Sequence, residues 1–195
     1  MKWMLFVDGE NLTIQGQKLA ELRGLQLETG RHFSRNVFLW MPGIHPREMW
    51  PKSLLVNALR AHYYTSVAGD EPRVNEVRSA LRQLGFDPEV FKKEAQKEKA
   101  KGVDIALTKD VLAGAFFNNY EIAVLIAGDG DYLPLIREVK RLGKLFYVAF
   151  FAREGLGLNP EMRIVADDFV DLEQDFSGAW TNELARLTRG REGRA

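Results

Sequence analysis

The sequence contains no cysteine among its 195 residues. Disulfide bonds, thiolate catalysis and zinc sites built on cysteine are therefore excluded. The chain also has no excess of charge of either sign, because 27 lysines and arginines balance 27 aspartates and glutamates. A protein that binds nucleic acid over much of its surface is usually strongly basic, so any such contact must be local.

Long hydrophobic runs are missing too. No stretch reaches the roughly 18 apolar residues of a membrane-spanning helix. The first residues lead straight into an apolar segment at 3–8, without the pattern of a cleavable signal peptide. We therefore expect a cytoplasmic protein that does not enter a membrane.

What remains is an ordinary globular composition, with 46% hydrophobic residues. The length suits a single domain, which we place at residues 1–175, followed by a polar C-terminal tail at 176–195.

Apolar runs typical of buried strands alternate along the chain with segments of helical periodicity. Strands are expected at residues 3–8, 37–40, 62–67, 88–92, 122–127, 145–151 and 169–172. Helices are expected at 51–61, 71–84, 103–116, 132–142 and 160–166, and residues 11–23 are helical or loop-like. The alternation predicts a three-layer α/β/α fold with a mostly parallel central sheet.

Four aspartates lie where apolar segments meet polar breaks. Asp8 ends the first strand, Asp129 and Asp131 follow the strand at 122–127, and Asp104 opens a helix on its core-facing side. Ligands of open parallel sheets bind at the carboxyl ends of the strands, where the strand order reverses. We expect the first and fourth strand–helix units to flank that reversal, which would bring Asp8 close to Asp129. A group of carboxylates there needs a cation, and oxygen ligands favour Mg²⁺ or Mn²⁺.

Each of these aspartates also has a purely structural interpretation. Asp8 and Asp129 could cap the turns or helices that follow them, and Asp104 suits the positive end of a helix dipole. Asn11 could cap the first helix, hold Asp8 or position a water molecule. Glu10 is expected to be exposed in a loop and to point away from the site.

Three short segments match a known pattern, in the same order along the chain. They are Val-Asp-Gly-Glu-Asn-Leu at 7–12, Lys-Gly-Val-Asp-Ile at 101–105 and Ala-Gly-Asp-Gly-Asp-Tyr-Leu-Pro-Leu at 127–135. Over roughly residues 3–172, the sequence resembles the NYN domains of the LabA/DUF88 group, within the PIN-like nuclease superfamily. The resemblance implies a Rossmann-like, PIN-like α/β/α fold and a metal-dependent ribonuclease site. Many relatives carry serine where this chain has Ala127.

The resemblance also assigns roles to the acidic residues. It implies that the catalytic group consists of Asp8, Asp104, Asp129 and Asp131. Of these, Asp8, Asp104 and Asp129 are expected to hold Mg²⁺ or Mn²⁺, directly or through water. The ion would activate a water molecule for hydrolysis of an RNA phosphodiester bond.

Basic and aromatic residues near these segments are the expected substrate contacts. Lys101 and Asn11 are expected to support the catalytic group, and Lys97 and Lys99 to contact phosphates in a salt-sensitive way. The ring of Tyr132 is expected to stack on an unpaired base. The expected partner is therefore RNA, single-stranded, and assembly of identical chains is left open.

Two other functions compete with the ribonuclease interpretation. Gly128-Asp129-Gly130 is similar to an acidic loop of haloacid-dehalogenase-like phosphatases, in which Asp8 would be the nucleophile. Against that reading, Glu10 stands where those enzymes have a second aspartate. The other alternative is a non-catalytic module that binds RNA or protein.

Overall fold

The computed structural model describes residues 1–24, 33–34, 38–39, 58–83, 85–93 and 102–173. Its main feature is a six-stranded sheet in which every neighbouring pair of strands is parallel. In spatial order, the strands are β5 (Asp87–Lys93), β4 (Arg60–Ala68), β1 (Trp3–Asp8), β6 (Ile122–Ile126), β7 (Leu145–Phe150) and β8 (Asp168–Asp171). A separate two-stranded antiparallel pair consists of β2 (Phe33–Ser34) and β3 (Phe38–Leu39).

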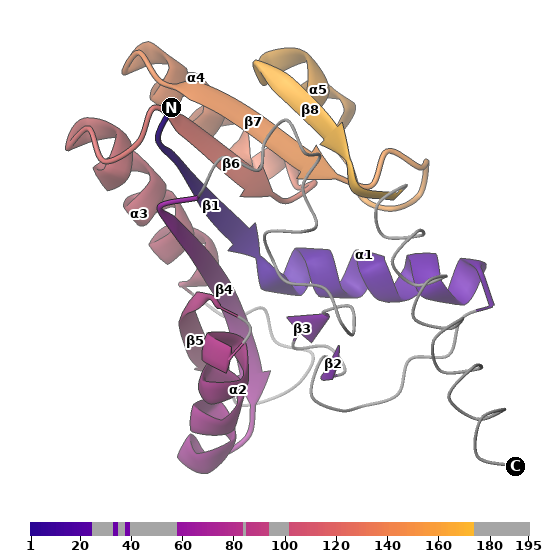
Figure 1. Cartoon of the computed structure of the whole chain (residues 1–195). Coiled ribbons are helices and arrows are strands. Elements are labelled where there is room, and N and C mark those ends of the chain that lie inside the picture. Colours follow the sequence, from indigo (N-terminus) through magenta and orange to yellow (C-terminus); the bar gives the residue numbers. More distant parts are fainter. Residues whose placement is uncertain (25–32, 35–37, 40–57, 84, 94–101, 174–195) are drawn as a thin grey trace, which may run out of the picture.

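Helices cover both faces of the six-stranded sheet (Figure 1). They are α1 (Gly9–Leu22), α2 (Glu71–Gln83), α3 (Val103–Phe116), the short 3-10 helix η2 (Gly130–Tyr132), α4 (Leu133–Arg141) and α5 (Pro160–Val165). The buried residues of α1 and α2 share one core with Leu5 and Val7 of β1. Those of α3, α4 and α5 share the other core with Met4 and Phe6. The predicted three-layer α/β/α fold with a parallel central sheet is confirmed.

The two central strands explain why parts of the sequence are continuously apolar. All six residues of β1 and all five of β6 are buried, because helices cover both of their faces. The edge strand β5 instead alternates between buried and more exposed positions. Continuous apolar runs therefore mark the centre of the sheet, and alternation marks its edge.

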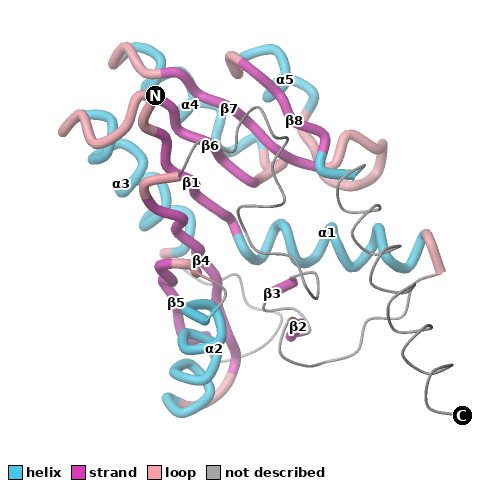
Figure 2. The backbone as a smooth tube through the Cα atoms, viewed as in Figure 1, coloured by secondary structure: helices cyan, strands magenta, loops and turns pink. Residues whose placement is uncertain are grey.

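The strand order reverses between β1 and β6. From β1 the chain proceeds through β4 and β5 to one edge, and from β6 through β7 and β8 to the other. Val7 pairs with Ile126, so the two strands end side by side (Figure 2). The carboxyl ends of β1 and β6 therefore form the place where a fold of this kind binds its ligands.

Two glycines allow close packing at this edge. A Cβ atom on Gly9, the first residue of α1, would lie 2.1 Å from the ring of Tyr63. A Cβ atom on Gly128, just after β6, would lie 2.5 Å from the ring of Phe150. Neither position leaves room for a larger residue, so the tight turns after both strands require glycine.

Some predicted boundaries differ from the structure. Helix α1 begins at Gly9 rather than at residue 11, because Asp8 caps it directly at the strand end. The predicted helix at 51–61 lies outside the described residues up to 57, and Arg60 and Ala61 belong to β4. The predicted tail at 176–195 lies wholly outside the described residues.

Candidate active site

Asp8 lies at the carboxyl end of β1, where the strand order reverses, and its two carboxylate oxygens have different partners. One carboxylate oxygen, Oδ1, accepts the backbone N–H of Asn11 at 2.9 Å, which makes Asp8 the N-cap of α1. Yet Asp8 is only 6% exposed, whereas a residue that only caps a helix usually faces water. The capping interpretation is therefore correct, but it accounts for only one of the two carboxylate oxygens.

Asn11 connects the ends of the two central strands. Its backbone N–H donates to Asp8, and its side-chain Oδ1 accepts the backbone N–H of Gly128 at 2.9 Å. The turn after β6 is thus tied to the first turn of α1. Asn11 supports the site by holding these two segments together, through a contact that joins residues 117 positions apart.

The hydroxyl group of Tyr132 joins Asp8 to Asp104. It lies 3.0 Å from Oδ2 of Asp8 and 3.2 Å from Oδ1 of Asp104, in the first turn of α3. A phenol has one proton, so it can donate to only one of these carboxylates at a time. Three segments far apart in the sequence therefore meet at one hydroxyl, and acceptors outnumber donors there.

Ionisation of the Asp8 carboxyl is therefore unfavourable. Burial raises the pKa of the Asp8 carboxyl to about 7, in spite of the hydrogen bonds from Asn11 and Tyr132, which favour its ionised form. The negative charges of Asp104 and Glu10 contribute to this raised pKa. Burial and the two carboxylates also raise the pKa of the Tyr132 hydroxyl, so this group stays protonated. A positive charge placed here would relieve the repulsion.

Asp129 and Asp131 belong to the turn after β6, which also carries Tyr132. The Asp129 carboxylate accepts the backbone N–H of Asp131 at 3.1 Å and so caps η2, while the Asp131 side chain is exposed. Within the described residues, no three histidine, aspartate or glutamate side chains are grouped to hold a metal ion. The predicted direct convergence of Asp8, Asp104 and Asp129 is therefore not present in this part of the chain.

The structure contradicts one of the predicted substrate contacts and does not describe the others. Tyr132 is only 3% exposed, so its ring has no free face for a base, and the stacking prediction is wrong. The burial follows from its place under the first turn of α4, where the ring joins the apolar core. Lys97, Lys99 and Lys101 lie outside the described residues.

An ion pair next to the site was missed from the sequence. Glu10 does not point into solvent; it accepts from the ammonium group of Lys93 and from the hydroxyl of Ser66, each at 3.0 Å. The Lys93 side chain is only 4% exposed. Lys93 ends β5 and Ser66 lies near the end of β4, so parallel strands bring both to the edge that holds Asp8. Their positions at strand ends were the signal that could have found them.

The donor atoms suit a hard divalent cation. Asp8 and Asp104 offer carboxylate oxygens on either side of one hydroxyl, and Mg²⁺ is commonly held by one or two carboxylates together with water and substrate phosphate. Asp8 and Asp104 are therefore the residues that could hold such an ion, together with water and substrate. No nitrogen or sulfur ligand lies among these contacts, which disfavours zinc.

The family model for the NYN domain matches residues 2–173, nearly the whole described chain. The chain belongs to the NYN domain family. NYN domains are part of the PIN-like nuclease superfamily, whose members are generally nucleases that bind nucleic acid and usually use divalent metal ions. The predicted NYN domain is thus confirmed, and its acidic edge lies where ligands of such a fold bind.

A solved structure supports the fold of this NYN domain. The crystal structure of a protein of unknown function from Vibrio parahaemolyticus is similar, with a TM-score of 0.60 and 21% sequence identity. The match covers 90% of this chain and 94% of that chain. At this identity the likeness establishes the fold alone.

No curated protein matches the sequence. No helix in the described ranges has the length and apolar character needed to cross a bilayer.

Proposed function

We propose that this NYN domain is a metal-dependent ribonuclease that hydrolyses phosphodiester bonds of single-stranded RNA with Mg²⁺ or Mn²⁺. We assign it to the LabA/DUF88 group on the three ordered segments at 7–12, 101–105 and 127–135. The single observation that carries the proposal is the meeting of Asp8 and Asp104 at the Tyr132 hydroxyl. Asp104 is exposed rather than core-facing as predicted, but Asp8 is buried, and a buried carboxylate next to a second one is costly unless a cation binds near them.

In this proposal each acidic residue has its own task. Asp8 and Asp104, which share the Tyr132 hydroxyl, would hold the ion through their carboxylate oxygens. Asp129 and Asp131, at the end of the neighbouring strand, accept hydrogen bonds from water in the site and orient it toward the phosphate. When bound, the ion lowers the pKa of a water molecule and offsets the negative charge that develops on the phosphate oxygens.

Positive charge for the substrate comes from the lysine-rich segment. Lys97, Lys99 and Lys101 precede α3, whose first turn holds Asp104. Their ammonium groups are proposed to contact phosphates of the bound RNA. Each phosphate contact of this kind weakens as salt concentration rises, so binding should be salt-sensitive.

The phosphatase interpretation has less support. The phosphatase pattern needs a second aspartate two residues after the nucleophile, but Glu10 stands there and is paired with Lys93. The family match also points to nucleases rather than to phosphatases. The non-catalytic module differs from the ribonuclease in one outcome, because it binds RNA without cleaving it at any Mn²⁺ concentration.

The decisive experiment compares RNA cleavage by the wild-type chain and by Asp104→Asn. Asp104 is exposed on α3, so the substitution should leave the fold intact. We expect Mn²⁺-dependent cleavage of a labelled single-stranded RNA, reduced at least about 100-fold in the variant because an ion ligand is lost. Asp168→Asn is the matched control. Asp168 is an exposed aspartate at the start of β8, the edge strand farthest from β5.

Three outcomes would count against the proposal. Equal cleavage by the wild type and Asp104→Asn would assign the activity to a contaminant or to another site. RNA binding without cleavage would favour the non-catalytic module. Turnover of a small phosphate monoester, with no action on RNA, would favour the phosphatase.

A further inference from the structure

Tyr132 is fixed in place by its surroundings. Its ring belongs to the apolar core on the α3 and α4 side of the sheet, and the residue is only 3% exposed. Its backbone N–H also donates to the carbonyl oxygen of Asp129 at 3.2 Å, which closes the turn after β6. Packing and turn together determine where the hydroxyl lies, since a buried aromatic ring has little freedom to move.

The hydroxyl in turn limits the separation of the two carboxylates. It lies 3.0 Å from Oδ2 of Asp8 and 3.2 Å from Oδ1 of Asp104. Because both distances end on one atom, the hydroxyl keeps the two carboxylate oxygens within about 6 Å of each other. A divalent cation with bonds of about 2.0–2.6 Å joins oxygens up to about 5 Å apart, so the shared donor holds the pair close to the separation that one cation can span.

The packing of the Tyr132 ring does not require its hydroxyl. A phenylalanine ring would fill the same space in the core, and a buried hydroxyl is costly unless it is hydrogen-bonded. The partners of this hydroxyl in the described part of the chain are the two carboxylates. Its presence is therefore explained by Asp8 and Asp104 and not by the packing of the ring.

We infer that Tyr132 is a positioning residue for the metal ion: its hydroxyl orients the carboxylates of Asp8 and Asp104 so that one divalent cation can bind both. The inference rests on the proposed metal site. Groups that hydrogen-bond to metal ligands fix their orientation, and their loss typically weakens metal binding about 10- to 100-fold. Tyr132 occupies that position between two ligands from different elements, one ending β1 and the other opening α3.

The test is Tyr132→Phe in the full chain, with Mn²⁺ affinity measured by isothermal titration calorimetry. We expect the dissociation constant to rise at least about tenfold, because the carboxylates lose their common donor. The matched control is Tyr120→Phe. Tyr120 is also buried, and its hydroxyl donates to the carbonyl oxygen of Val111 at 2.7 Å, away from the acidic residues. This control should bind Mn²⁺ within twofold of the wild type.

Thermal midpoints without metal separate positioning from a general loss of structure. Both variants lose one buried hydroxyl, so their midpoints should fall by similar amounts while only Tyr132→Phe loses Mn²⁺ affinity.

The inference is overturned if Tyr132→Phe binds Mn²⁺ within twofold of the wild type, or if Tyr120→Phe loses as much affinity. Absence of Mn²⁺ binding by the wild type would overturn it together with the metal site. Wild-type Mn²⁺ binding without RNA cleavage would reject the ribonuclease alone, and the affinity ratio would still decide the role of Tyr132.

Discussion

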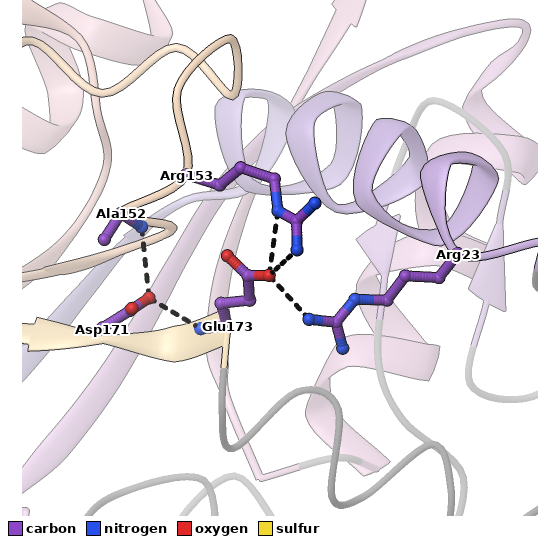
Figure 3. Close-up of polar contacts among 5 residues, drawn as sticks. All are labelled: Arg23, Ala152, Arg153, Asp171 and Glu173. Atoms are coloured by element: carbon purple, nitrogen blue, oxygen red, sulfur yellow. Dashed lines mark hydrogen bonds and ion pairs between the residues drawn. The ribbon is translucent and has the colours of Figure 1, made fainter.

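Two polar clusters at the carboxyl edge of the sheet are built in opposite ways. In the first cluster, at the candidate active site, one hydroxyl lies between two carboxylates, those of Asp8 and Asp104. In the second cluster, one carboxylate lies between two guanidinium groups: Oε1 of Glu173 accepts from Arg23 at 2.6 Å and from Nε of Arg153 at 2.9 Å (Figure 3). The first cluster has one hydroxyl donor for two carboxylates, and the second has two guanidinium donors for one carboxylate.

The backbone completes the second cluster. The Asp171 carboxylate accepts the N–H groups of both Ala152 and Glu173, at 3.1 and 2.9 Å (Figure 3). Hydrogen bonding to Arg153 holds the pKa of the Glu173 carboxyl below its usual value, whereas burial raises that of Asp8. A cluster that satisfies its own charges stabilises the fold. A cluster with more acceptors than donors instead leaves negative charge that a bound cation would neutralise, which is the basis of the proposed metal site.

The largest expected difference between the clusters comes from removing one aspartate from each. Asp8→Asn should reduce Mn²⁺-dependent RNA cleavage at least about 100-fold, because a ligand is lost. It should also raise the free energy of unfolding at pH 8 by about 2 kcal/mol without metal, because a buried, repelled charge disappears. Cleavage assays and urea denaturation measure the two effects.

Asp171→Asn is the matched substitution in the second cluster. It should lower the free energy of unfolding by about 1 kcal/mol, because the amide accepts the two backbone N–H groups less strongly than a carboxylate does. Cleavage should stay within twofold of the wild type. If Asp8→Asn destabilised the protein as Asp171→Asn does, the contrast between the clusters would be wrong.

The second prediction concerns pH. The pKa of Asp8 is about 7 in the folded chain, above its ordinary value of 3.8, so the folded state holds this proton more tightly than the unfolded state. Without metal, the contribution of Asp8 to stability should therefore fall as pH rises from about 4 to 7, by up to about 1.4 kcal/mol per unit, and stay level above. Urea denaturation of wild type and Asp8→Asn across this range isolates that contribution.

Metal binding should reverse this trend, because Mn²⁺ binds the ionised carboxylate. The rise in the thermal midpoint on adding Mn²⁺ should be larger at pH 8 than at pH 5.5. An equal rise at both pH values would show that the ion binds somewhere other than Asp8.

The smallest expected effect comes from neutralising the shared carboxylate of the second cluster. Glu173→Gln should lower the free energy of unfolding by about 1 kcal/mol, because Arg23 and Arg153 lose the anion between them. Mn²⁺ affinity should not change. Glu161→Gln is the control, since its pair with Arg137 is exposed and should contribute close to nothing. A change in Mn²⁺ affinity caused by Glu173→Gln would mean that the clusters are coupled.

Most of the fold could be predicted because its signals are local. The apolar runs at 3–8 and 122–127 are β1 and β6, and the periodicity at 71–84 is α2. The start of α1 was placed two residues late, because Gly9 resembles a break unless the ring of Tyr63 beside it is known. That contact joins residues distant in sequence, which no local pattern records.

The site could be predicted only in part, for the same reason. Strand-end position was enough to single out Asp8, and helix-start position to single out Asp104. The role of Tyr132 was misassigned, because an aromatic residue beside acidic residues looks the same in sequence whether its ring is exposed or buried. The pairing of Glu10 with Lys93 was missed because it depends on two strands ending at one edge.

Strand and helix order, the acidic residues at element ends and family membership can all be read along the chain, since each rests on neighbouring residues. Which acids share a proton donor, which lysine neutralises Glu10 and which aspartate only caps a turn depend on how far apart side chains lie in space. Hydrogen bonds and charge repulsion act over a few ångströms, so only the folded arrangement of β1, α3 and η2 makes Asp8, Asp104 and Tyr132 one unit.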